Sequence, residues 1–354
     1  ENAEDEVIGH HLEQAFRCRA QLGLAGPRER ELAVLAQARL EAAARKVLLG
    51  GDPHAAIDLL ERAASLLPPD DPDRLGVLPA LGAALFEGGR LVDADRVLQE
   101  AIDHDEADDL LRARARVEQQ FVRIQAEGAI SGARQVADET LEVFELHRDE
   151  LGQSRAWCLK AAIDWMRGCV AAADESWRRA ALHAERGGAE RELFDILDWR
   201  VSAALYGPTP VDEGIESCRE IGERVRRSPV AYAETLYPLA ALHAMRGEID
   251  VSRSLLAESP EPDEPGRVYS AGLAQTEALV EMLADRPEVA EERLRTALGV
   301  LEQMGEKALL SSTAAMLAQA LYDQGRLDDA EEAARLSREN AAGEDVSPQI
   351  VWRG

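Results

Sequence analysis

The chain repeats itself with a period of about 39 residues, and this periodicity constrains its fold more than any other feature. A small residue recurs at the position where the second helix of each packed pair is expected to cross the first. Successive members lie 38, 39, 40, 41, 38, 38 and 40 residues apart. The series runs Ala56, Ala94, Ala133, Ala173, Gly214, Ser252, Ala290 and Ala330. Such self-similarity indicates a solenoid, in which each unit buries its apolar face against its neighbours.

A glycine precedes most of these small residues by about five positions, as expected of a turn between two helices. Helices commonly end in a left-handed residue, a conformation that glycine adopts without steric cost. The fifth unit has a longer Gly207-Pro208-Thr209-Pro210 turn, and the seventh replaces the glycine with Asp285-Arg286-Pro287. The predicted turn glycines are Gly51, Gly89, Gly128, Gly168, Gly207, Gly247 and Gly325.

The second unit shows the predicted packing most clearly. Two apolar stripes at helical spacing flank the Gly88-Gly89 turn, so two helices with one apolar face each must pack antiparallel. The small residues Gly82 and Ala94 would let the two backbones approach closely. The first stripe consists of Leu78, Leu81, Gly82 and Leu85, and the second of Leu91, Ala94, Leu98 and Ala101.

This order of stripe, glycine and stripe resembles the tetratricopeptide repeat. The composition agrees, because Ala and Leu dominate the 46% of hydrophobic residues and only 4% are aromatic. We therefore predict an all-α fold, a right-handed α-α superhelix of about eight tetratricopeptide-like helix pairs over residues 28–342. Residues 1–27 form a lead-in helix, and residues 343–354 begin a truncated ninth repeat. The parent chain is expected to continue in both directions.

The net charge of −27 argues against partners that are themselves anionic. Nucleic acids and anionic lipid surfaces need clustered Lys and Arg, so neither is an expected partner. No apolar run is long enough for a transmembrane helix, and the acidic start lacks a signal core. We predict a cytoplasmic protein whose four cysteines are reduced, small core residues. These are Cys18, Cys158, Cys169 and Cys218.

Two end segments carry a further resemblance. Residues 10–17, His-His-Leu-Glu-Gln-Ala-Phe-Arg, resemble the helix that leads into the repeats of bacterial adenylate/guanylate cyclase–ATPase–tetratricopeptide signalling proteins. Residues 345–353, which contain Asp-Val and end in Trp-Arg, are similar to a second stretch of that group. The resemblance implies that this chain is a sensor or docking arm and that catalysis lies elsewhere in a larger protein. Large LuxR-type ATP-dependent regulators share this layout.

Sequence motifs for catalysis or cofactor binding are absent. The chain has no phosphate-binding loop, no GxGxxG and no HExxH, so we predict no cofactor and no metal. Adjacent His10 and His11 point about 100° apart on a helix, which suits chelation poorly. The acidic run 103–109 lacks the central Gly and final Glu of a calcium loop and is interpreted as a turn before a helix. His243 falls on an apolar stripe and is interpreted as a structural imidazole.

Aromatic residues concentrate in the centre of the chain, where the repeats depart most from consensus. Eight of fifteen lie between residues 157 and 237, and Lys160 and Arg200 fall near expected core positions there. In tetratricopeptide superhelices the first helix of each pair lines the concave surface. Aromatic anchors with an arginine are typical of binding hot spots, although large residues also fill irregular repeat packing, as expected for Trp177. The candidate groove residues are Arg155, Trp165, Met166, Phe194 and Tyr237.

The sequence is compatible with several functions. The first is a non-catalytic interaction and sensor arm that binds a peptide, a small effector or a partner domain, the parent chain's own ATPase domain included. The alternatives are the effector-binding arm of a LuxR-type transcriptional regulator and an acidic scaffold that recruits basic peptides. A stand-alone enzyme on a helical scaffold is the reading that the residues favour least.

Overall fold

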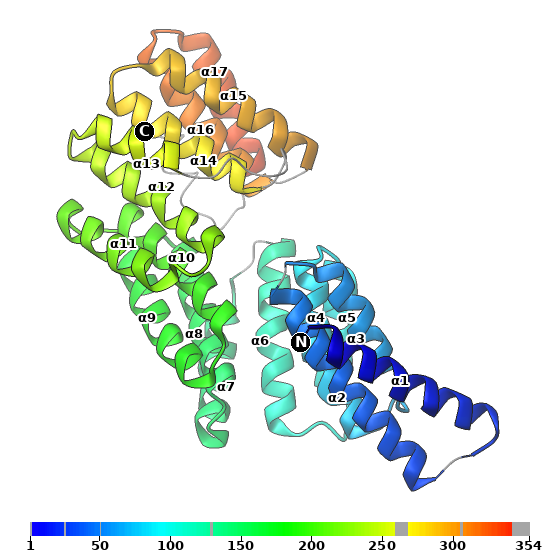
Figure 1. Cartoon of the computed structure of the whole chain (residues 1–354). Coiled ribbons are helices and arrows are strands. Elements are labelled where there is room, and N and C mark those ends of the chain that lie inside the picture. Colours follow the sequence, from blue (N-terminus) through cyan, green and yellow to red (C-terminus); the bar gives the residue numbers. More distant parts are fainter. Residues whose placement is uncertain are drawn as a thin grey trace. The chain divides into compact units, whose positions relative to one another are not determined.

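The computed structural model describes residues 2–24, 26–49, 51–127, 130–258, 268–304 and 307–341. Every regular element in these ranges is an α-helix. The lead-in helix α1 spans Asn2–Gln21, and the remaining helices form eight consecutive pairs (Figure 1). The all-α prediction and the predicted number of pairs are confirmed.

The first helices of the pairs are the longer set. They are α2 (Pro27–Leu49), α4 (Pro72–Glu87), α6 (Asp109–Glu127), α8 (Glu150–Met166), α10 (Glu190–Tyr206), α12 (Pro229–Met245), α14 (Val268–Leu283) and α16 (Lys307–Asp323). The second helices are α3 (Pro53–Ala64), α5 (Leu91–Asp103), α7 (Ala133–His147), α9 (Val170–Gly187), α11 (Val211–Val225), α13 (Ile249–Glu258), α15 (Pro287–Met304) and α17 (Leu327–Asn340).

The predicted small residues all lie on second helices, and every one is buried. All but one occupy the fourth residue of their helix, the exception being Ala133, which begins α7. Close approach is visible in the second pair, where a Cβ added to Gly82 would stand 2.5 Å from the Leu98 side chain. The periodicity therefore marks the helix crossings, as predicted.

The turn glycines hold a left-handed backbone in five of the predicted positions: Gly51, Gly89, Gly168, Gly247 and Gly325. Asp285 replaces glycine in the seventh pair and is itself left-handed, with φ 58°. Gly128 lies outside the described residues. The prediction is wrong for Gly207, which is extended (φ −89°, ψ −179°). Pro208 follows it, and a proline disfavours helical conformations in the residue before it.

The chain divides into two compact units, residues 1–159 and 160–354. The first unit contains α1 to α7 and most of α8, with a core of Leu and Ala side chains from α2 to α6. A smaller cluster around Phe144 continues this core into α8. The second unit contains the end of α8 and all later helices, with one core around α10 to α12 and another around α14 to α17.

The lead-in helix α1 packs against α2 and carries a buried carboxylate. Glu13 is 3% exposed, and Arg62 on α3 donates to it at 2.6 Å while Arg17 approaches within 2.8 Å. The predicted ninth repeat, at residues 343–354, lies outside the described residues.

The cysteines are free, as predicted, but only one belongs to the core. Cys218 on α11 is buried, and burial raises the pKa of its thiol to about 12. Cys158 is half-buried, whereas Cys18 and Cys169 are exposed. The core assignment was therefore wrong for these last two, because Cys18 lies on the outer face of α1 and Cys169 caps α9.

Candidate functional site

An aromatic cluster is the most distinctive surface of the second unit. Trp165 on α8 has its ring centroid 5.6 Å from Trp177 on α9 and 5.5 Å from Trp199 on α10. Trp177 and Trp199 stack at 5.4 Å with an interplanar angle of 13°. Tyr206, at the end of α10, meets Trp165 edge-on at 6.1 Å. Trp177, which is buried on the second helix α9, therefore connects the aromatic residues of the first helices α8 and α10.

The cluster opens to solvent on α10. Trp177 is 3% exposed and anchors the group, as the sequence indicated, but Trp199 is 46% and Tyr206 60% exposed. The spacing of Asp195, Trp199, Ser202 and Tyr206 explains this, because steps of four, three and four residues follow one face of a helix. The opposite face of α10 packs into the core of the unit.

Two half-buried carboxylates lie on α10 and on the neighbouring helix α12. Burial, together with the like charge of Asp195, raises the pKa of Asp198 on α10 to about 6. Burial raises the pKa of Glu234 on α12 to about 7, with further contributions from Asp198 and Asp195. Neither Asp198 nor Glu234 makes a hydrogen bond or an ion pair with a described residue. A carboxylate removed from water without a counter-charge resists ionisation, which accounts for both shifts.

Four of the residues singled out from sequence lie on first helices of the second unit. Trp165 belongs to the aromatic cluster, and its neighbour Met166 ends α8; both are half-buried. Phe194 on α10 is also half-buried and packs against the core of the unit. Tyr237 on α12 is only 7% exposed and offers little surface to a partner.

Arg155 belongs to the first unit and has local partners there. It forms a bidentate pair with Glu118, with Nε at 2.7 Å and a terminal nitrogen at 2.5 Å from the carboxylate. Its guanidinium also lies 4.4 Å from the centre of the Phe121 ring. Through these contacts, Arg155 helps to pack α6 against α8.

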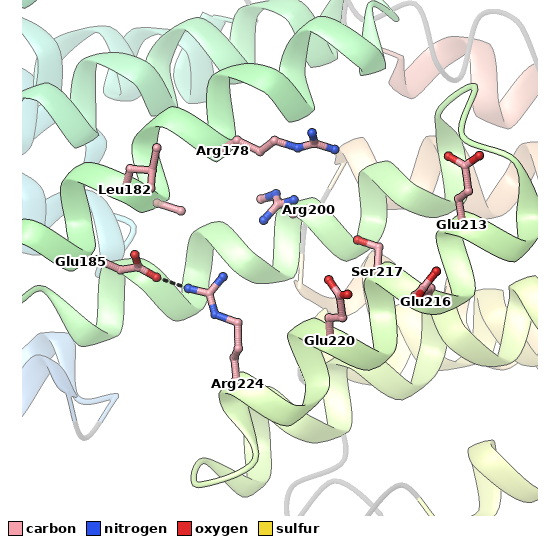
Figure 2. Close-up of a pocket in the computed structure, with 10 residues that line it drawn as sticks. Arg178, Leu182, Glu185, Arg200, Glu213, Glu216, Ser217, Glu220 and Arg224 are labelled. Atoms are coloured by element: carbon pink, nitrogen blue, oxygen red, sulfur yellow. Dashed lines mark hydrogen bonds and ion pairs between the residues drawn. The ribbon is translucent and has the colours of Figure 1, made fainter.

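A separate groove of about 610 Å³ lies between α9, α10 and α11 (Figure 2). Its arginines are already paired: Arg178 and Arg200 both meet Asp174, at 2.9 and 3.0 Å, and Arg224 pairs with Glu185. The pairing also explains how Arg200 sits near the core position that the sequence indicated. Three exposed carboxylates line the α11 side of the groove: Glu213, Glu216 and Glu220.

Other polar groups have structural roles. His243 is 3% exposed, with Nδ1 at 2.6 Å from Glu248 and Nε2 at 3.3 Å from Arg219. In the acidic run 103–109, α5 ends and α6 begins, and Asp108 accepts a hydrogen bond from the backbone N–H of Leu111. Among the described residues no group of His, Cys, Asp and Glu could hold a metal, and no helix could span a membrane.

The sequence indicated the aromatic region, but it did not single out the exposed Trp199 and Tyr206 or the two acids that have no partner among the described residues. Trp199 and Tyr206 lie within the aromatic-rich stretch, and their helical spacing from Asp195 was available as a signal. No comparable signal marks Asp198 and Glu234, because the absence of a partner depends on what α10 and α12 bring near them.

The fold resembles solved helical-repeat structures over almost its whole length. A Rap protein complexed with Competence and Sporulation Factor superposes with a TM-score of 0.62 and 10% identity, covering 96% of this chain and 98% of the other. The apo quorum sensor NprR from B. thuringiensis gives 0.61 at 13% identity, covering 96% and 97%. Aspartyl phosphate phosphatase F from Bacillus subtilis gives 0.56 at 12%, covering 96% and 94%.

At these identities the likeness establishes a tetratricopeptide-like helical-repeat fold and nothing beyond it. No protein-family model and no curated protein matches the sequence.

Proposed function

We propose that this chain is a non-catalytic interaction arm that binds a protein or peptide segment on the first helices of its second unit. The observation that carries the proposal is the aromatic surface of Trp165, Trp199 and Tyr206. Trp199 is 46% exposed and Tyr206 is 60% exposed, and both lie against the ring of Trp165, so the cluster leaves apolar surface in water. Such clustered aromatic surface is typical of interaction sites, where Trp and Tyr supply much of the binding energy.

The structural neighbours support a binding role without establishing it. One was crystallised as a complex with Competence and Sporulation Factor, and another is named a quorum sensor. One fold hosts many functions, so the binding role is inferred from the aromatic surface itself. A third neighbour is named a phosphatase, which makes hydrolysis of a phosphate ester such as p-nitrophenyl phosphate the natural enzymatic control. We expect no turnover above buffer.

The wider setting that we propose is a cytoplasmic bacterial signalling protein in which this arm senses or docks for an ATPase or nucleotide cyclase. Residues 10–17, which carry the resemblance to that group, lie within α1. The second such segment, at residues 345–353, lies outside the described residues. The effector-binding arm of a LuxR-type regulator is the alternative, and the parent reading frame on both sides distinguishes the two.

A random peptide display library selected on the purified chain tests the binding role. Wild-type protein is expected to enrich related sequences, and the double variant W199A/Y206A is expected to lose them. Tyr322→Ala is the matched control, because Tyr322 is an aromatic residue, 62% exposed, on another first helix of the same unit, α16. Failure of wild type to enrich any sequence, or equal enrichment by W199A/Y206A, would refute the proposed site.

A further inference from the structure

Buried and half-buried carboxylates in this protein are commonly paired with arginine. Glu13, Glu118 and Glu281 have side chains 4%, 13% and 13% exposed, and each has an arginine nitrogen within 2.8 Å. Asp198 and Glu234 are also half-buried, yet they make no hydrogen bond or ion pair with any residue in the described ranges. No described residue offsets the cost of removing a charge from water at these two positions.

The described charges that act on the pKa values of this pair are negative. Asp195, one turn before Asp198 on α10, acts on both carboxyl groups, and Asp198 acts on Glu234. Helices α8, α9, α11, α13 and α14 lie next to α10 or α12, and no described cation contributes to the pKa of Asp198 or Glu234. Within the described part of the chain, the two carboxyl groups therefore have no counter-charge.

An exposed aromatic residue lies next to Asp198 on α10. Trp199 directly follows Asp198, and it shares the exposed face of α10 with Asp195 and Tyr206. The face of an indole or phenol ring attracts cations, and the attraction strengthens where water is excluded. Aromatic faces next to uncompensated carboxylates form a surface complementary to a cationic side chain.

We propose that the face of α10 and α12 formed by Asp198, Trp199 and Glu234 binds an arginine or lysine side chain of a protein or peptide partner. This inference rests on the proposed function and specifies the chemistry of its ligand. The partner's cation supplies the counter-charge that the carboxylates lack, while the aromatic rings cover its aliphatic stem. The recognition is local, in contrast to diffuse attraction by the net charge of −27.

Binding of the cationic side chain is linked to the release of protons. An incoming cation stabilises the ionised carboxylates, so it lowers their raised pKa values and releases protons when it binds below neutral pH. Binding is therefore expected to tighten between pH 5.5 and 8, as Asp198 and Glu234 become available as anions.

The same display selection tests the inference, followed by titration calorimetry with an enriched peptide. Enriched sequences are expected to share an Arg or Lys, and replacing it with norleucine is expected to weaken binding about tenfold or more. The variant D198N/E234Q is expected to bind the peptide more weakly than wild type by a similar factor. The matched control is E213Q/E216Q, which removes two exposed carboxylates from α11 in the same unit (Figure 2) and is expected to bind within about twofold of wild type.

The outcomes separate this inference from the proposed function. Peptides that depend on Trp199 but share no basic residue would overturn the inference and leave the binding role intact. Equal weakening by D198N/E234Q and E213Q/E216Q would show diffuse attraction and overturn it as well. Selection of no peptide by wild type would refute both. The circular dichroism spectrum of D198N/E234Q must match that of wild type. The pH dependence of the stability of E234Q tests, without any ligand, whether Glu234 has a counter-charge.

Discussion

Replacing Glu234 with glutamine removes a charge for which the described residues offer no counter-charge, so the variant is expected to be more stable than wild type at alkaline pH. Burial raises the pKa of this carboxyl to about 7, from an ordinary value of 4.5. A raised pKa means that the folded state holds the proton more tightly than the unfolded state. Stability is therefore full below pH 4.5 and is lost as the pH rises through 7.

The size of the effect follows from the shift. At 1.36 kcal/mol per pKa unit, full ionisation of Glu234 costs about 3 kcal/mol. About 2 kcal/mol of that falls between pH 5.5 and pH 8, both above the isoelectric point of about 4.7. Glutamine keeps the shape and does not titrate. The free energy of unfolding of E234Q minus that of wild type is thus expected to rise by about 2 kcal/mol over this interval.

Urea unfolding followed by tryptophan fluorescence measures this difference, because Trp165, Trp177 and Trp199 all report on the second unit. The other titratable groups are common to both proteins, so their contributions cancel, except for the repulsion between Asp198 and Glu234, which E234Q also removes and which acts in the same direction. Glu216→Gln is the control, since Glu216 is exposed on α11 and its variant should track wild type at both pH values within about 0.5 kcal/mol. A constant difference between E234Q and wild type, or the same rise in E216Q, would refute the reasoning.

Three further predictions concern stability. Gly82→Ala places a Cβ 2.5 Å from Leu98 and is expected to cost about 1–3 kcal/mol in urea unfolding. Asp285→Gly relieves a left-handed backbone at φ 58° and is expected to raise the melting temperature, with a gain of up to about 1 kcal/mol. Arg62→Ala leaves the 3% exposed Glu13 with a weaker set of partners and is expected to cost about 2–3 kcal/mol at pH 7. Although burial alone raises the pKa of Glu13, its arginines lower it overall, so the cost should persist at pH 4.5 and shrink as the pH falls below that value.

Each of the three has a matched comparison. Gly76 lies on the same helix as Gly82 with open space around it, so Gly76→Ala should be neutral or stabilising. Gly325 occupies the turn equivalent to Asp285, and Gly325→Ala should destabilise where Asp285→Gly stabilises. An Arg62→Ala cost that stays unchanged well below pH 4.5 would argue against a charge pair with Glu13.

The repeat architecture could be predicted from the sequence because it depends on local properties. Small residues about 39 positions apart mark helix crossings through their size, and turn glycines mark left-handed backbone through their lack of a Cβ. These properties belong to one residue and its near neighbours. The single failure among the described turns, Gly207, also has a local cause in Pro208.

Tertiary structure alone decided which central residues are available to a partner. Tyr237 and Trp199 look alike in sequence, but α12 is enclosed by neighbouring helices while one face of α10 remains open, so only Trp199 is exposed. Glu118 and Glu234 are likewise both acids on first helices. Arg155 reaches Glu118 from 37 residues away, and no described cation reaches Glu234. The exposure of a side chain and the pairing of its charge depend on residues far away in the sequence. Helical periodicity does not indicate which of those residues come close.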